Sequence, residues 1–264
     1  MSVRSQLGIA RPLAEGRVVR VAAPSVDSSF GMKMLPGTLS MIAGSVDVIS
    51  FLGLGGLFTA HITGNLILIA AHIVRGTGVS PVHLLSVPVF IAVLGVTRLL
   101  VAGLEAAGLA SLRPLLLLQL LLLTGFLAFS VAAGPSISPD KVITILAGML
   151  GVSAMAVQNA MVVMSLKDSP STAVMTTNIT RFVMDVGEVL LGNDRDKVAE
   201  ASRRARHTFP AMIGFAGGAG LGAGCFVVAG LWSLMLPTTL ALLALVISLA
   251  ARKNNQRRAQ RCHS

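Results

Sequence analysis

The chain has no tyrosine, a single tryptophan and only two cysteines among its 264 residues, and charged residues make up just 12% of it. Cys225 lies in an apolar stretch and Cys262 in a basic tail, which is neither a disulfide framework nor the spacing of a metal site. No zinc-binding helix motif, Walker loop or serine nucleophile elbow occurs. The sequence therefore predicts no metal centre, no cofactor and no enzyme.

What remains is strongly apolar, because hydrophobic residues make up 54% of the chain and the mean hydropathy is +0.81. A bilayer core of about 30 Å needs about 20 helical residues per crossing. Residues 34–74 contain one charge, Asp47, and residues 209–251 contain no Asp, Glu, Lys or Arg. Composition thus predicts an all-α, polytopic transmembrane helical bundle embedded in the lipid bilayer.

Run lengths predict about eight hydrophobic segments. The two long runs each accommodate two segments, with turns near Gly53, Gly55 and Gly56 and around 230–233. The remaining segments are predicted at 84–106, 113–134, 141–166 and 171–192, separated by prolines. We prefer eight crossings on run length, but six crossings satisfy the charges equally well if 57–74 and 171–192 are re-entrant or half-length.

Basic residues fall into three clusters, which set the predicted topology. Fifteen of the 21 Lys and Arg lie in the amino-terminal tail, the loop 193–208 and the carboxyl tail. The positive-inside rule places all three in the cytoplasm, in reach of anionic lipid headgroups. Nucleic-acid binding is not expected, because no aromatic residues alternate with these charges. The predicted organisation is a disordered basic arm over 1–34, a membrane domain over 35–250 and a basic tail over 251–264.

Polar residues inside an apolar run are the best indication of function. Asp47 lies in the first span, and His61, Thr63, Gly64 and Asn65 follow within the string FTAHITGN. A buried carboxylate must be paired or protonated, which suits proton coupling or, alternatively, a structural hydrogen bond. Thr63-Gly64-Asn65 predicts either a helix break at a solute site or close helix packing.

The second half contains a similar set of polar residues. Gln158 and Asn159 interrupt one predicted span, and Asn178, Thr180 and Arg181 lie in the next. Arg181 and Asp185 are i, i+4 neighbours placed to neutralise each other, and the alternative is that Asp185 and Glu188 lie in the headgroup region near the end of the span. Arg181 could instead bind an anionic solute or pair with Asp47, for which Arg98 is a competing partner. The spacing Gly214-x-x-x-Gly218-x-x-x-Gly222 predicts close helix packing.

Weak internal similarity predicts two repeats, 35–134 and 141–250. AGSVD at 43–47 aligns with AMAVQ at 154–158, and TAHIT at 59–63 aligns with TTNIT at 176–180. Four segments in each half would make the repeats parallel copies. The alignment predicts that Asp47, Thr63, Asn65, Gln158 and Thr180 converge on one buried cavity.

The strings AGSVDVISFLGLGGLFTAHITGN, AMAVQNA and VMTTNIT resemble the YoaK family, which are bacterial multi-pass membrane proteins. The resemblance covers about 35–250 and departs from the family pattern at Ala156 and Arg181. It implies a protein of the bacterial inner membrane without an established substrate. It also marks certain residues as signature positions: Asp47, Phe58, Thr63, Gly64, Asn65, Gln158, Asn159 and Thr180.

The sequence favours a secondary transporter or exporter of a small solute, because buried ionisable residues, predicted broken helices and a repeat occur together. Proton-coupled transport is one form of this hypothesis. A membrane scaffold or interaction subunit is the alternative, and a membrane-embedded enzyme is the least favoured class. A homo-oligomer is compatible with all of these.

Overall fold

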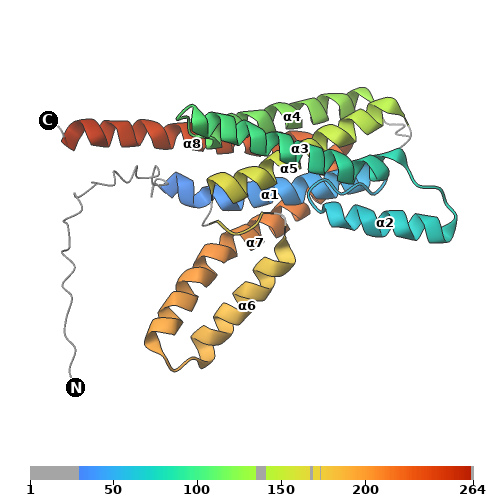
Figure 1. Cartoon of the computed structure of the whole chain (residues 1–264). Helices are drawn as coiled ribbons and strands as arrows, with labels where there is room; N and C mark the ends of the chain where they lie inside the picture. The colour runs from blue at the N-terminus through green and yellow to red at the C-terminus, as the bar shows by residue number, and fades with distance from the viewer. Residues whose placement is uncertain (1–29, 135–140, 167–168, 173, 263–264) are drawn as a thin grey trace, which may run out of the picture.

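The computed structural model describes residues 30–134, 141–166, 169–172 and 174–262, with side chains from 34 to 251. All regular structure in this part of the chain is helical, which confirms the predicted helical membrane bundle (Figure 1). The elements are α1 (Phe30–Gly53), α2 (Ile62–Arg75), α3 (Pro81–Ala106), α4 (Leu112–Ala132), α5 (Val142–Ser165), α6 (Met175–Leu191), α7 (Arg195–Ala229), the 3-10 turn η1 (Gly230–Leu234) and α8 (Met235–Cys262).

Local chemistry explains where these helices begin and end. Gly55 and Gly56 adopt positive φ angles of 71° and 87° directly after α1, a conformation that only glycine adopts without strain. The carboxylate of Asp194 accepts bonds from the backbone N–H groups of Asp196 and Lys197 and so caps α7. The predicted turns near Gly53 and around 230–233 are both confirmed.

Helix length separates six long helices from two short ones. α1, α3, α4 and α5 are each long and apolar enough to cross a membrane, and a further such stretch over 195–251 is folded back at η1 into α7 and α8. With 14 and 17 residues, α2 and α6 reach only about 21 Å and 26 Å. The described part of the chain thus has six helices long enough to cross a bilayer and two half-length ones, α2 and α6, where run length suggested eight full crossings.

Glycines bring α1 and α7 into backbone contact. A Cβ atom on Gly214 would meet the carbonyl of Gly37, and one on Gly218 would meet the carbonyl of Met41. The same register continues to Gly222, which lies against Ser45. Because the residue numbers of the contacting positions rise together along α1 and α7, the two helices run parallel. The predicted packing role of the Gly-x-x-x-Gly series is therefore confirmed.

The two halves of the chain make corresponding contacts. α1 packs against α7 and α8, while α5 packs against α3 and α4, and the short helices α2 and α6 pack against α3 and α7. If α1, α2, α3 and α4 are matched in order with α5, α6, α7 and α8, each of these helix contacts in one half has a counterpart in the other: α1–α7 corresponds to α5–α3, α1–α8 to α5–α4, and α2–α3 to α6–α7. Gln158 reaches Leu39 near the start of α1, whereas Gly151 and Gly148 lie near Thr59 and Leu57, beyond its end. α1 and α5 are thus antiparallel, so a repeat relating the halves is inverted and not parallel.

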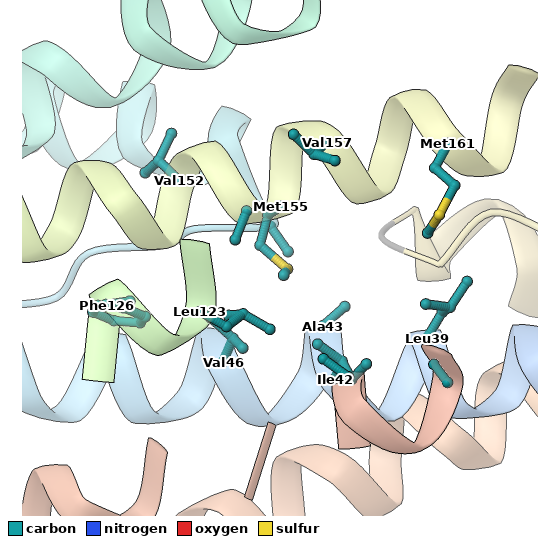
Figure 2. Close-up of a cluster of buried hydrophobic side chains, with 14 of the residues drawn as sticks. Leu39, Ile42, Ala43, Val46, Leu123, Phe126, Val152, Met155, Val157 and Met161 are labelled. Carbon is teal, nitrogen blue, oxygen red and sulfur yellow. The ribbon is translucent and has the colours of Figure 1, made fainter. Parts of the chain in front are cut away.

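The centre of the bundle is apolar. Leu39, Ile42, Ala43 and Val46 of α1 face Met155 and Met161 of α5, with Leu123 and Phe126 of α4 beside them (Figure 2). All of these side chains are completely or almost completely buried. This layer closes the middle of the molecule.

A hairpin made of α6 and the first half of α7 is angled away from the bundle (Figure 1). The basic segment 193–208, predicted as a loop, is mostly the first turns of α7. Of the predicted disordered arm, residues 1–29 lie outside the described residues, while 30–34 begin α1. α8 continues into the basic tail as far as Cys262.

Candidate functional site

Asp47 holds the connection between α1 and α2 in place. Its Oδ1 accepts bonds from the backbone N–H groups of Thr59 (2.8 Å) and Ala60 (2.6 Å) and from the Thr59 hydroxyl (3.0 Å). Its Oδ2 accepts the backbone N–H of His61 (3.2 Å) and contacts the Nδ1 of the same residue. Asp47 is only 4% exposed, so this single carboxylate satisfies the polar groups of a buried loop. We call this set of residues the aspartate hub.

Asn65 closes the same loop from the side of α2. Its Oδ1 accepts the backbone N–H of Phe58 (3.0 Å), and its Nδ2 donates to the Phe58 carbonyl (2.7 Å). The helix break therefore lies at 54–61, and Thr63-Gly64-Asn65 forms the first turn of α2, contrary to the prediction that these three residues are the break. The backbone groups are satisfied by Asp47 and Asn65, which is why an irregular segment is tolerated inside an apolar bundle.

Gln158 makes the corresponding connections in the second half. Its Nε2 donates to the Leu39 carbonyl (2.9 Å) and to the Thr172 hydroxyl (3.0 Å), and its Oε1 accepts a bond from the Nε2 of Gln119 (2.6 Å). All three side chains are 1% exposed or less, and the Oε1 of Gln119 has no protein partner. This glutamine hub thus ties α5 to α1, to α4 and to the segment before α6, and keeps one acceptor free.

The two hubs share a detailed pattern. Asn178, the fourth residue of α6, donates to the carbonyl of Ser171 seven residues earlier, as Asn65, the fourth residue of α2, does to Phe58. The hydroxyl that each hub binds belongs to the residue six before the asparagine, Thr59 in one half and Thr172 in the other. The matching strings are thus FTAHITGN (58–65) and STAVMTTN (171–178), so the predicted alignment of TAHIT with TTNIT was four residues out of register.

The predicted single cavity does not form. Leu39 and Asp47 are eight residues apart on α1, about 12 Å, so the two hubs lie on opposite sides of the apolar layer. Thr63 is exposed on α2, and exposed Thr180 bonds to the Thr176 carbonyl of its own helix. Asn159 likewise donates to the carbonyl of Met155 in its own helix. Only Asp47, His61 and Asn65 converge as a group, because helix breaks place each hub at a different depth.

The predicted ion pairs of Arg181 are also wrong. The partner of Asp185 is Arg204 of α7, at 2.8 Å and 2.9 Å, and Arg204 also contacts Glu200. Arg181 and Arg98 are exposed, and the ion-pair partner of Asp47 is His61. The reason is burial, since Asp185 is only 8% exposed where α6 packs against α7, whereas Arg181, one turn earlier on α6, is exposed.

Some residues of these hubs carry no obvious signal in the sequence. Thr59, Thr172 and Gln119 are ordinary polar residues in apolar surroundings, although the alignment of FTAHITGN with STAVMTTN would have identified both threonines. His83 is 2% exposed, and neither ring nitrogen has a protein partner. It faces His72 of α2 with 5.8 Å between ring centres. Among the described residues, no group of three or more His, Cys, Asp or Glu could hold a metal ion.

The chain was compared with models of known protein families. Residues 35–247 match the model of a family described as protein of unknown function (DUF1275), which covers most of the chain. The chain belongs to the DUF1275 family. YoaK is a member of it, so the resemblance drawn from the sequence motifs is confirmed. No curated protein and no solved structure matches this DUF1275 protein. Family membership and the apolar helices together establish an integral membrane protein.

The glutamine hub can be tested for a role in holding the bundle together. We expect Gln158→Met to lower the free energy of unfolding by about 2 kcal/mol, because two interhelical bonds and the bond to Thr172 are lost and buried polar partners are left unpaired. Thermal unfolding of the purified protein in detergent measures this. Asn159→Met is the matched control, since among the described residues that amide bonds only within its own helix, and an equal loss in both variants would contradict the assignment.

Proposed function

We propose that this DUF1275 protein is a secondary transporter of a small solute. The observation that carries the proposal is the pair of hubs, each holding a helix break and lying on opposite sides of a closed apolar layer. Inverted repeats with broken helices near the midplane are a recurrent architecture of secondary transporters. We propose no catalytic role for any residue.

The arrangement suits alternating access. Each hub fixes the start of a short helix, α2 on one side and α6 on the other, by side-chain bonds to the irregular segment that precedes it. Breaking one hub would free one short helix while the other hub stays closed. The free Oε1 of Gln119 offers an acceptor to a solute donor or to water on its side of the layer. An unchanged apolar centre would then separate the two openings.

The orientation follows from the charges. Six crossings place both termini on the same side as the first turns of α7, so all three basic clusters lie together in the cytoplasm. α2 and its connection to α3 then lie on the outer side, and the glutamine hub lies nearer the cytoplasm. We place the protein in the bacterial inner membrane on the family resemblance.

Proton coupling, in this proposal, runs through His61 and Asp47 together. Asp47 accepts three backbone N–H bonds and therefore has a structural task. The His61 side chain is 36% exposed, whereas that of Asp47 is 6% exposed, so the imidazole is the member of the pair that a proton reaches. Histidine changes charge in the physiological pH range, which fits it for this role.

The test uses full-length protein in liposomes loaded with the pH dye pyranine. Pools of amino acids, sugars, carboxylates and organic cations are added outside, and solute-dependent proton movement is recorded. We expect His61→Gln to reduce this movement at least about tenfold, since glutamine keeps a donor for Asp47 but cannot titrate. His72→Gln is the matched control, because His72 bonds only to the Leu68 carbonyl of its own helix.

The outcomes separate the alternatives. Solute-dependent proton movement that persists in His61→Gln at the wild-type rate would exclude coupling through this pair while leaving transport intact. Absence of flux for every pool in the wild type would favour the membrane scaffold over the transporter.

A further inference from the structure

The projecting hairpin leaves one face of α6 uncovered. Ile179, Val183, Val186 and Leu190 follow each other at helical spacing, and three of them are 50%, 58% and 76% exposed: Ile179, Val183 and Leu190. α6 packs mainly against α7, so no other described helix covers this stripe. Exposed apolar stripes of this kind bind membranes or partner proteins.

The stripe borders a groove of about 310 Å³ between α6 and α7. Phe182 and Phe209 form its floor, with 5.6 Å between their ring centres. The other lining residues are apolar or small except for one, Arg206. The groove thus combines an apolar channel with a single cation at its edge.

Arg206 differs from its neighbour Arg204 in having no acidic partner. Arg204 is paired with Asp185 and Glu200, whereas no described carboxylate lies within ion-pair distance of Arg206. Arg206 is exposed, and Arg195, Lys197 and Arg203 lie on the preceding turns of the same helix. The cation at the groove is therefore available to an anion from outside the chain.

The corresponding hairpin of the first half lacks this charge. α2 also exposes apolar side chains, Ile67 at 71% and Val74 at 87%, but its only Lys or Arg is Arg75. Lipid contact alone would explain apolar exposure on both hairpins. Only the α6–α7 hairpin adds a cluster of cations, on the side that the proposed orientation turns toward the cytoplasm, where anionic lipids attract basic segments.

We propose that the groove between α6 and α7 binds an anionic phospholipid. The acyl chain lies along Phe182, Val186 and Leu190, and the phosphate contacts Arg206 at the membrane surface. The hairpin is then an interfacial anchor that keeps the segment before α6, and with it Thr172 of the glutamine hub, at a fixed depth. This proposal rests on the cytoplasmic placement of the hairpin and is independent of transport.

Bromine-labelled lipids can test this with the full chain. In a Trp232→Phe background, a tryptophan is placed at Val183 on the stripe, or at Met184, which is 69% exposed but one residue further round the helix. Each protein is reconstituted in vesicles containing dibromo-phosphatidylglycerol or dibromo-phosphatidylcholine. We expect strong quenching at position 183, greater with phosphatidylglycerol, and weak quenching without headgroup preference at position 184.

Charge variants make the test specific. Arg206→Gln should lower the preference for phosphatidylglycerol about fivefold, the size expected for one basic residue at an anionic surface. Lys197→Gln should leave it unchanged, because Lys197 pairs with Asp194 and does not line the groove. Millimolar inorganic phosphate should not compete.

Any of three results would overturn the proposal. These are equal quenching by the two lipids at position 183, equal effects of Arg206→Gln and Lys197→Gln, and relief of quenching by inorganic phosphate. Absence of quenching at position 183 would overturn it too, and would point to a second copy of the chain covering the stripe.

Discussion

Replacing Asp47 by asparagine is expected to lower the free energy of unfolding by about 3–5 kcal/mol, the largest loss for any polar substitution in the bundle. The carboxylate accepts three backbone N–H bonds, the Thr59 hydroxyl and the His61 contact, and it does so in a buried loop. An amide offers one acceptor oxygen and turns its NH₂ group toward donors. Unfolding in mixed detergent micelles, followed by circular dichroism, measures the loss.

Ser45→Ala is the control for this prediction. Ser45 is equally buried on α1, but its hydroxyl bonds only to the Ile42 carbonyl of the same helix, so a change below about 1 kcal/mol is expected. Cysteine accessibility at residue 57 provides a second readout, because loosening of the loop should expose it in Asp47→Asn alone. A stable Asp47→Asn with a protected loop would show that the hub does not hold the break.

The second large effect is expected at the contact between α1 and α7. Gly218→Ala should cost about 3 kcal/mol or prevent folding, because the added Cβ would meet the backbone of Met41 at its carbonyl carbon, oxygen and Cα. Backbone atoms in two packed helices cannot move aside as a flexible side chain could. The yield of monodisperse protein after size-exclusion chromatography and its thermal midpoint measure the effect.

Gly220→Ala is the matched control on the same helix. A Cβ at Gly220 has no atom within 4 Å, so this change should be neutral or slightly stabilising through helix propensity. Both glycines belong to Gly-x-x-x-Gly spacings in the sequence, and only the structure distinguishes them. Equal behaviour of the two variants would mean that α1 and α7 do not approach as closely as described.

The class of the protein could be predicted because it depends on summed hydropathy. Runs of 41 and 43 apolar residues exceed one bilayer crossing whatever their neighbours are, so the long spans follow from length alone. Their observed limits agree closely, for example 112–132 against the predicted 113–134. The number of crossings was harder, because α2 is apolar yet too short to cross, α6 is short and carries three charged residues, and hydropathy does not detect where a helix breaks.

The hubs were only partly predictable. That Asp47 must have partners could be predicted, since a lone carboxylate in 41 apolar residues demands them. The partners of Asp47 could not be predicted, because they are mainly the backbone N–H groups of Thr59, Ala60 and His61. Every residue except proline has such a group, so the sequence does not mark them. The ion-pair partner of Asp185 could not be predicted either. Whether it is Arg181 or Arg204 depends on how α6 packs against α7, which the sequence does not show.

The sequence by itself determined that this chain is a helical membrane protein with polar residues concentrated in FTAHITGN and its weaker copy, because burial in lipid penalises each charge whatever the fold. Tertiary structure alone decided that these residues form two hubs and not one cavity. The reason is that α1 and α5 cross antiparallel, which carries Asp47 and Gln158 to opposite sides of the apolar layer. Helix direction depends on where the chain breaks and turns between segments, and only the assembled bundle shows that.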